Sequence, residues 1–355
     1  MPRARSKLGS MGSSRYTDSA KGTTASAFAS AAQSKRASQR GEAITITGLA
    51  PKDHLRRLTC KGHPERVIAK EHTFVVEQTP TFDHFVHPKN ASKNRFPNLL
   101  LYDHTRVVLD DEHQKQYGDY IHASYVDGYD RAAQYILAQA PINEQQEADL
   151  WRLVWKEMPT VIVLLAPTTD SEHVNQCSQF WPDVNQERFY CAGGISVKTE
   201  QLKKSPEFDL YHALVSATRE SVSVRLIYMR EWDDDDNVPA TLLPLQSKAR
   251  IIASQCEKQS ERAMSPMLVL CPTGAHRSGT FTAMDILLRR IQSTRRVGLQ
   301  ETVDTMRKQR YGVLEKSSHY LYLTESLVNY AVQAAFVHPQ DVGEAGVAFK
   351  LMKQK

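Results

Sequence analysis

Short apolar runs separated by polar stretches recur through the middle of the chain and predict buried strands. Two of these runs, Val161–Leu165 and Met267–Leu270, contain only apolar residues, which is typical of a strand covered on both faces. A third, Val222–Met229, alternates apolar and polar positions and predicts a further strand. All of them are far shorter than the roughly 20 apolar residues that a bilayer-spanning helix needs.

Two other segments repeat their apolar residues at the three- and four-residue spacing of an amphipathic helix. The apolar positions of the first are Trp151, Val154, Trp155 and Met158, an aromatic stripe typical of a protein core. Those of the second, which follows Ser278, are Phe281, Met284, Leu287, Leu288 and Ile291. Residues 49–88 mix basic, apolar and aromatic positions without a clean period, and we expect helices there that pack across the domain.

The residues with the clearest chemistry lie between the predicted strand Met267–Leu270 and the helix after Ser278. They read Cys-Pro-Thr-Gly-Ala-His-Arg-Ser-Gly from Cys271 to Gly279. The N-terminus of a helix offers unpaired backbone N–H groups and a positive dipole end, which favour a bound dianion and a thiolate. Arg277 supplies a planar fork for two phosphate oxygens, and the Ser278 hydroxyl can point back at the sulfur. The pattern predicts attack of the Cys271 thiolate on phosphorus. A buried core thiol is the alternative.

This loop resembles the signature of the protein tyrosine phosphatases, in which five residues separate the cysteine from an arginine followed by Ser or Thr. A longer resemblance covers residues 93–109, which read Lys-Asn-Arg-Phe-Pro-Asn-Leu-Leu-Leu-Tyr-Asp-His-Thr-Arg-Val-Val-Leu. They are similar to the family's phosphotyrosine-recognition loop and the strand after it. The resemblance implies that Phe96, where Tyr is usual, stacks on the substrate ring. It also implies that Asn98, where Asp is usual, accepts a hydrogen bond from the substrate backbone. An ordinary core aromatic is the alternative for Phe96.

Scaffold segments of the same family follow in the expected order. Residues 120–129 resemble a family strand in which Asn usually stands where this chain has His122, and residues 135–141 resemble the next one. Trp181-Pro182-Asp183 spells the family's general-acid tripeptide, but its surroundings match a segment on the far side of the sheet, so we interpret Asp183 as a turn residue. The resemblance covers roughly residues 60–335. It implies an α/β domain with a mixed, highly twisted sheet flanked by helices.

The resemblance places the general-acid loop after Val222–Met229, where the chain has four consecutive aspartates between Trp232 and Asn237. Trp and a later Val-Pro are kept, but the family's Pro and Gly are replaced and the loop is one residue longer. Counting from Trp232 makes Asp234 the acid that protonates the leaving phenolate, whereas counting back from Val238 makes it Asp235, and we favour Asp234. Adjacent carboxylates raise one another's pKa, which helps an acid stay protonated. A solvated acidic turn is the alternative.

Further departures concern the phosphate loop and the second chemical step. Leu270 replaces the His that usually precedes the cysteine, which removes a polar neighbour. Residues 306–320 resemble the family's final motif, in which two glutamines position the water that hydrolyses the cysteinyl-phosphate. Glu315 and His319 stand in their places, and Glu315 puts a negative charge beside the phosphate. The predicted substrate-binding residues are Phe96, Asn98, Thr273, Gly274, Ala275, His276, Glu315 and His319.

Two functions follow from these motifs. The first is hydrolysis of phosphotyrosine in proteins without metal or cofactor, with Cys271 as nucleophile, Arg277 as phosphate clamp, Asp234 as acid and Ser278 assisting breakdown of the intermediate. The second is a weak or inactive pseudophosphatase that binds phosphotyrosine proteins. The Phe96 wall implies a deep pocket, which disfavours a dual-specificity enzyme for phosphoserine.

Charge and cysteine content complete the expectations. Residues 1–42 hold a net charge of +6 and the whole chain +5, so the remainder, at −1, is not expected to bind nucleic acid. We expect a disordered basic Ser/Ala-rich tail over 1–43, the phosphatase domain over 44–335 and a C-terminal tail over 336–355. A phosphorylated or anion-binding arm and a mitochondrial presequence are the alternatives for the first tail. Five cysteines without CxxC spacing and no secretory segment predict a cytoplasmic protein without a membrane span. The oligomeric state is left open.

Overall fold

The computed structural model describes residues 48–59, 64–72, 80–168, 177–232, 237–259 and 265–342. The predicted N-terminal tail lies outside the described residues, as do most of the predicted C-terminal tail and Asp233–Asp236, which include both general-acid candidates. Within the described ranges, no helix combines the length and the apolar character needed to cross a membrane.

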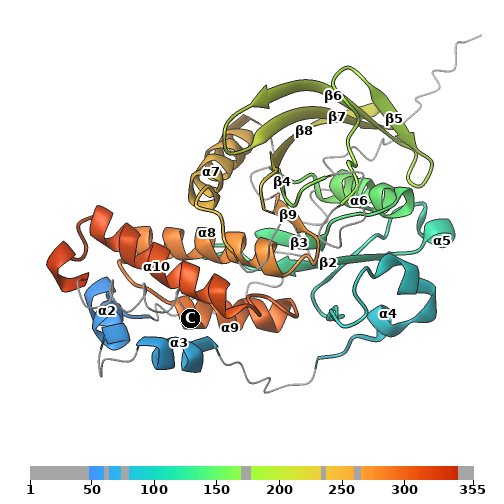
Figure 1. Cartoon of the computed structure of the whole chain (residues 1–355). Coiled ribbons are helices and arrows are strands. Elements are labelled where there is room, and N and C mark those ends of the chain that lie inside the picture. Colours follow the sequence, from blue (N-terminus) through green and yellow to red (C-terminus); the bar gives the residue numbers. More distant parts are fainter. Residues whose placement is uncertain are drawn as a thin grey trace, which may run out of the picture.

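One mixed sheet of nine strands, counted over the described residues, organises the chain in the order β1-β2-β3-β9-β4-β8-β7-β6-β5 (Figure 1). Its centre consists of four parallel strands: β3 (Tyr135–Gln139), β9 (Met267–Cys271), β4 (Ile162–Leu165) and β8 (Glu220–Met229). The antiparallel flanks are β1 (Arg106–Val108), β2 (Tyr120–Val126), β7 (Asp209–Ala217), β6 (Ile195–Lys204) and β5 (Glu187–Tyr190). The three strands predicted from apolar runs are confirmed and all lie in this parallel centre.

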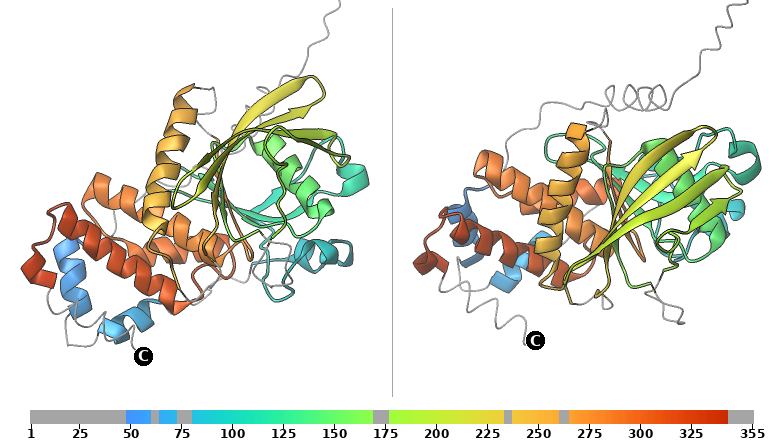
Figure 2. Two further views of the ribbon diagram at one scale, coloured as in Figure 1. Left: turned by 45° about the horizontal axis from the view of Figure 1, so that its top comes forward. Right: turned by 90° about the horizontal axis from the view of Figure 1, so that it is seen from above.

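Helices cover both faces of the sheet (Figure 2). Strand side chains alternate between the two faces, so the core is divided into two parts. One face packs against α7 (Leu242–Gln259), α8 (His276–Thr294), α9 (Leu299–Gln309) and α10 (Ser317–Gln333), and the other against α6 (Glu144–Glu157). In β9, Val269 and Cys271 belong to the core on the α8 side, whereas Leu268 and Leu270 belong to the core on the α6 side. Leu270 therefore sits in an apolar environment, on the opposite face of the sheet from the thiol.

Shorter elements complete the domain. They are α2 (Pro51–Thr59), α3 (Pro64–His72), α4 (Asp83–Val86), η1 (Pro88–Lys93), α5 (Gln114–Tyr117) and η2 (Pro339–Val342). Helices α2 and α3 pack against α10. They confirm the helices expected in residues 49–88, where the apolar positions have no clean period.

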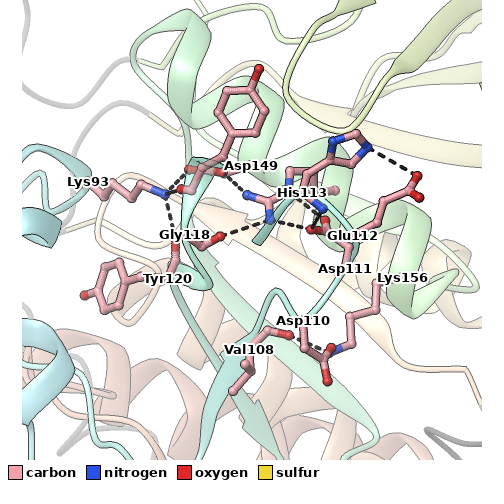
Figure 3. Close-up of polar contacts among 12 residues, drawn as sticks. Lys93, Val108, Asp110, Asp111, Glu112, His113, Gly118, Tyr120, Asp149 and Lys156 are labelled. Carbon is pink, nitrogen blue, oxygen red and sulfur yellow. Dashed lines mark hydrogen bonds and ion pairs between the residues drawn. The ribbon is translucent and has the colours of Figure 1, made fainter. Parts of the chain in front are cut away.

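A buried ionic chain fixes the beginning of the recognition loop, at the end of η1, to helix α6 (Figure 3). The Lys93 ammonium lies 2.7 Å from the Asp149 carboxylate, and the two side chains are 7% and 4% exposed. It also donates to main-chain carbonyls at the end of α5 and the beginning of β2. Arg152 continues the chain by donating to Asp149 at 2.8 Å and to Asp111 at 2.7 Å. The pairs anchor the loop because an unpaired buried charge is costly.

We expect Lys93→Met to lower the free energy of unfolding by about 3 kcal/mol, because it leaves the Asp149 carboxylate buried with one cationic partner fewer. Urea denaturation monitored by tryptophan fluorescence measures this change. Lys89→Met is the matched control, since Lys89 lies on the exposed side of the same 3-10 helix. Equal losses in the two variants would show that the ionic chain contributes nothing specific.

Candidate active site

Cys271 is the last residue of β9 and is followed by a four-residue loop and the first turn of α8. The cysteine is fully buried, and its Sγ lies 3.3 Å from the Ser278 hydroxyl oxygen and 3.5 Å from that of Thr273. The structure thus brings together the predicted nucleophile and the serine predicted to assist it. The strand, loop and helix are arranged as the sequence predicts.

Glycine is required at position 274 because the loop packs directly on the main chain of β3. Gly274 has a φ of +64°, and a Cβ there would lie 2.4 Å from the carbonyl carbon of Ala138 and from the amide nitrogen of Gln139. Gln139 is the register partner of Cys271 in the parallel β3–β9 pair. The backbone of β3 therefore sets the position of the phosphate loop.

Arg310 follows α9, and its guanidinium holds the phosphate loop between Cys271 and α8. It is fully buried and donates to the Gly274 carbonyl at 3.0 Å and to the Thr273 carbonyl at 3.2 Å. Burial lowers the pKa of Arg310 to about 10, so the group remains a cation at neutral pH. A cation that holds two consecutive carbonyls fixes the peptide planes between Cys271 and the helix.

His122 joins this arginine to the recognition loop. Its Nδ1 lies 2.9 Å from Nη2 of Arg310, and its Nε2 lies 3.0 Å from the carbonyl oxygen of Leu99. Because a guanidinium can only donate, Nδ1 accepts and Nε2–H donates to Leu99, which requires the neutral imidazole. Burial, and secondarily the charge of Arg310, lower the pKa of His122 to about 3. The imidazole therefore stays neutral and connects the two loops of the site.

The recognition loop reaches the same end of the sheet through Gln139. The Arg95 amide donates to the Gln139 side-chain oxygen at 2.9 Å, and the Arg95 guanidinium lies 5.3 Å from the centre of the Phe96 ring. Phe96 is partly buried, Asn98 is exposed, and Leu99 is buried. Phe96 thus lies in the loop that Gln139 and His122 tie to the phosphate loop.

Arg277 is fully buried and faces the beginning of the predicted acid loop. Its Nη1 donates to the carbonyls of Leu165, at 3.3 Å, and of Trp232. Its guanidinium carbon lies 5.7 Å from the centre of the Trp232 ring. The predicted phosphate clamp is therefore in contact with the residue directly before the four aspartates, in the segment that follows β8.

The two residues that replace the family's glutamines have different environments. Glu315 is exposed, and its carboxylate lies 3.4 Å from Nε2 of His276 in the phosphate loop. His319 is fully buried, with Nδ1 2.7 Å from the Thr280 hydroxyl and its ring 5.8 Å from that of Trp232. Since the Thr280 hydroxyl donates to the His276 carbonyl, it accepts from His319 Nδ1–H. Water handling by either residue stays a prediction.

Asp183 lies on an exposed turn closed by a hydrogen bond from the Gln186 amide to its carbonyl, while Trp181 is buried. The site also contains three polar residues to which the sequence analysis assigns no role: His122 and Gln139, in segments interpreted as scaffold, and Arg310, within the family's final motif. For two of them a signal existed, because His122 and Gln139 are polar positions in otherwise buried strands. Nothing in the sequence distinguishes Arg310 from the neighbouring basic residues of α9.

Comparison with known proteins agrees with this geometry. A model of the family described as protein-tyrosine phosphatase matches residues 90–329. Receptor-type tyrosine-protein phosphatase C of Homo sapiens is 29% identical over 246 residues, covering 68% of this chain and 18% of that protein. Receptor-type tyrosine-protein phosphatase zeta of Rattus norvegicus is 30% identical over 268 residues, covering 70% and 11%. The chain belongs to the protein-tyrosine phosphatase family.

A shorter relative matches as well. Tyrosine-protein phosphatase non-receptor type 7 of Rattus norvegicus is 29% identical over 247 residues, covering 69% of this chain and 66% of that protein. The chain spans less than a fifth of the length of the two receptor-type relatives. These matches confirm the family and the α/β fold predicted from the motifs. The class of enzyme that this family defines is protein-tyrosine phosphatase.

The buried neutral imidazole of His122 makes the fold sensitive to acid. Unfolded, this histidine takes up a proton near its ordinary pKa of 6.5, whereas in the folded chain it does so only near 3. Its contribution to stability is therefore complete above pH 6.5 and is lost as the pH falls toward 3. His54, whose pKa burial lowers to about 4, adds to the same trend.

We expect the change from pH 7 to pH 5 to lower the free energy of unfolding by about 2 kcal/mol through His122 alone. In His122→Asn the amide keeps a donor for Leu99 and an acceptor for Arg310 but does not titrate, so this part of the loss disappears. Urea denaturation at the two pH values measures both proteins. If both proteins lost the same free energy of unfolding between pH 7 and pH 5, His122 would already be protonated in the folded state at pH 5.

Proposed function

We propose that the chain hydrolyses phosphotyrosine in proteins through a cysteinyl-phosphate intermediate. The observation that carries the proposal is the position of Cys271. It ends a central parallel strand, lies 3.3 Å from Ser278, and begins a loop whose carbonyls are held by a buried arginine. Family membership supplies the substrate class. We further propose that the domain extends over residues 44–335 and acts in the cytoplasm, where a catalytic thiol stays reduced.

In the first step the Cys271 thiolate attacks phosphorus and the bond from phosphorus to the tyrosine oxygen breaks. The phenolate leaves with a proton from Asp234, or from Asp235 if the loop is counted from its other end. The Arg277 guanidinium and the loop N–H groups stabilise the charge on the equatorial phosphate oxygens. In this role Arg277 exchanges its carbonyl partners for two phosphate oxygens, a geometry that suits its planar fork.

In the second step water attacks the cysteinyl-phosphate, the bond from sulfur to phosphorus breaks, and the Ser278 hydroxyl donates to the thiolate that leaves. The carboxylate of the aspartate that protonated the phenolate takes the proton from the water. Glu315 is an unfavourable neighbour for this step, because its charge repels the phosphate dianion. Its pairing with His276 offsets that repulsion in part when the imidazole is protonated.

We expect the full chain to release phosphate from a phosphotyrosine peptide, Cys271→Ser to abolish the release, and Asp234→Asn to lower kcat by about 100-fold or more. A malachite-green assay of released phosphate measures all three. Asp235→Asn is the matched control, and a larger loss in that variant would assign the acid to Asp235 instead. Turnover that survives in Cys271→Ser would exclude the cysteinyl-phosphate mechanism.

A second function, binding of phosphotyrosine proteins without turnover, is favoured by two observations. Cys271 has no exposed surface, and Arg277 is already bonded to two main-chain carbonyls. Fluorescence anisotropy with a labelled phosphotyrosine peptide separates the two functions. Binding that Arg277→Ala removes, without phosphate release by the unmodified chain, would establish the binding protein. A single stoichiometric burst of phenolate would show that only the second step fails.

The charge of Glu315 gives a further test of the enzyme. We expect Glu315→Gln to raise kcat/KM for a phosphotyrosine peptide several-fold, because it removes a like charge beside the incoming dianion. The gain shrinks as the ionic strength rises, since Glu315 is exposed and screened by salt. Glu187→Gln, an exposed position on the edge strand β5, is the control. A fall in kcat/KM would instead assign Glu315 a direct role in handling water.

A further inference from the structure

The side chain of Thr273 lies where a bound phosphate needs its hydrogen-bond donors. Its Oγ1 accepts from the Ala275 amide at 3.2 Å and from the His276 amide at 3.1 Å. The same oxygen lies 3.5 Å from the Sγ of Cys271. One neutral hydroxyl therefore uses two N–H groups at the beginning of α8, next to the nucleophile.

These two N–H groups are among those that a phosphate oxygen requires. In a loop closing on a helix N-terminus, the backbone amides are the donors that recognise a dianion. An oxygen that accepts from both amides at ordinary hydrogen-bond distances, beside the sulfur, has the position and the partners of a phosphate oxygen. Phosphate and the Thr273 hydroxyl cannot accept from the two amides at full strength together.

The backbone of Thr273 cannot move aside to resolve this conflict. Its carbonyl is held by the buried Arg310 guanidinium at 3.2 Å, and the next residue, Gly274, is in contact with the main chain of β3. Only rotation of the side chain about χ1 releases the two amides. That rotation exchanges two hydrogen bonds for contacts with the phosphate.

We propose that Thr273 is a built-in competitor of the substrate phosphoryl group, whose hydroxyl occupies the loop amides until phosphate displaces it. This inference deepens the proposed function, because it concerns the same loop and sets how tightly the loop binds a phosphate ester. The threonine oxygen also lies beside the buried sulfur of Cys271, at 3.5 Å.

The test is the dissociation constant of inorganic phosphate, measured by isothermal titration calorimetry on the full chain. We expect Thr273→Ala and Thr273→Val to bind phosphate about five- to tenfold more tightly, since both remove the competing acceptor. Thr273→Ser keeps a hydroxyl and is expected to bind more weakly than either. Thr294→Ala, at the far end of α8, controls for the loss of a threonine hydroxyl elsewhere on that helix.

Each outcome decides the proposal. A gain in Thr273→Ala without a gain in Thr273→Val would assign the effect to bulk and would overturn competition by the hydroxyl. No gain in either variant, or no phosphate binding by any of the proteins, would also overturn it. Calorimetry does not depend on turnover, so a chain that fails to hydrolyse phosphotyrosine can still show the predicted order of affinities. If the chain is an enzyme, the same variants lower KM for a phosphotyrosine peptide.

Discussion

A single buried cation, the Arg310 guanidinium, joins the phosphate loop to the sheet. Its four donated hydrogen bonds go to Thr273 and Gly274 in the loop and to His122 and Ser124 on β2. A second constraint is the close contact of Gly274 with the main chain of β3. Arg310 and the backbone of β3 together position the anion site, and the burial of the guanidinium is tolerated because its N–H groups are hydrogen-bonded.

The fold was accessible from the sequence to the extent that it depends on local periodicity. Val161–Leu165 and Met267–Leu270 are apolar throughout because they become central parallel strands with a core on each face. The stripe after Ser278 became α8. The early helices α2 and α3 were harder to delimit, because their burial depends on contacts with α10, more than 200 residues later in the chain.

The sequence predicts the nucleophile of the candidate site, but it does not predict the residues that hold the phosphate loop in place. Cys271, Ser278 and Gly274 are close in sequence, so their spacing carries their geometry. His122, Gln139 and Arg310 meet only after β2, β3 and the end of α9 have packed, and pattern cannot assign partners that far apart. Thr273 shows the opposite difficulty. Its place in the motif predicts contact with substrate, but the direction of its hydroxyl depends on a side-chain rotamer that no sequence pattern encodes.

The alternation of side chains along β9 has a consequence for how such domains diversify. Cys271 faces the helices that form the anion site, whereas Leu270, its neighbour in sequence, faces α6 and the opposite core. One strand thus contributes side chains to two separate cores. Leucine next to the nucleophile is compatible with an intact loop for this reason. The chemistry of the domain and the apolar support of its sheet can drift independently, although they alternate residue by residue along the same five positions.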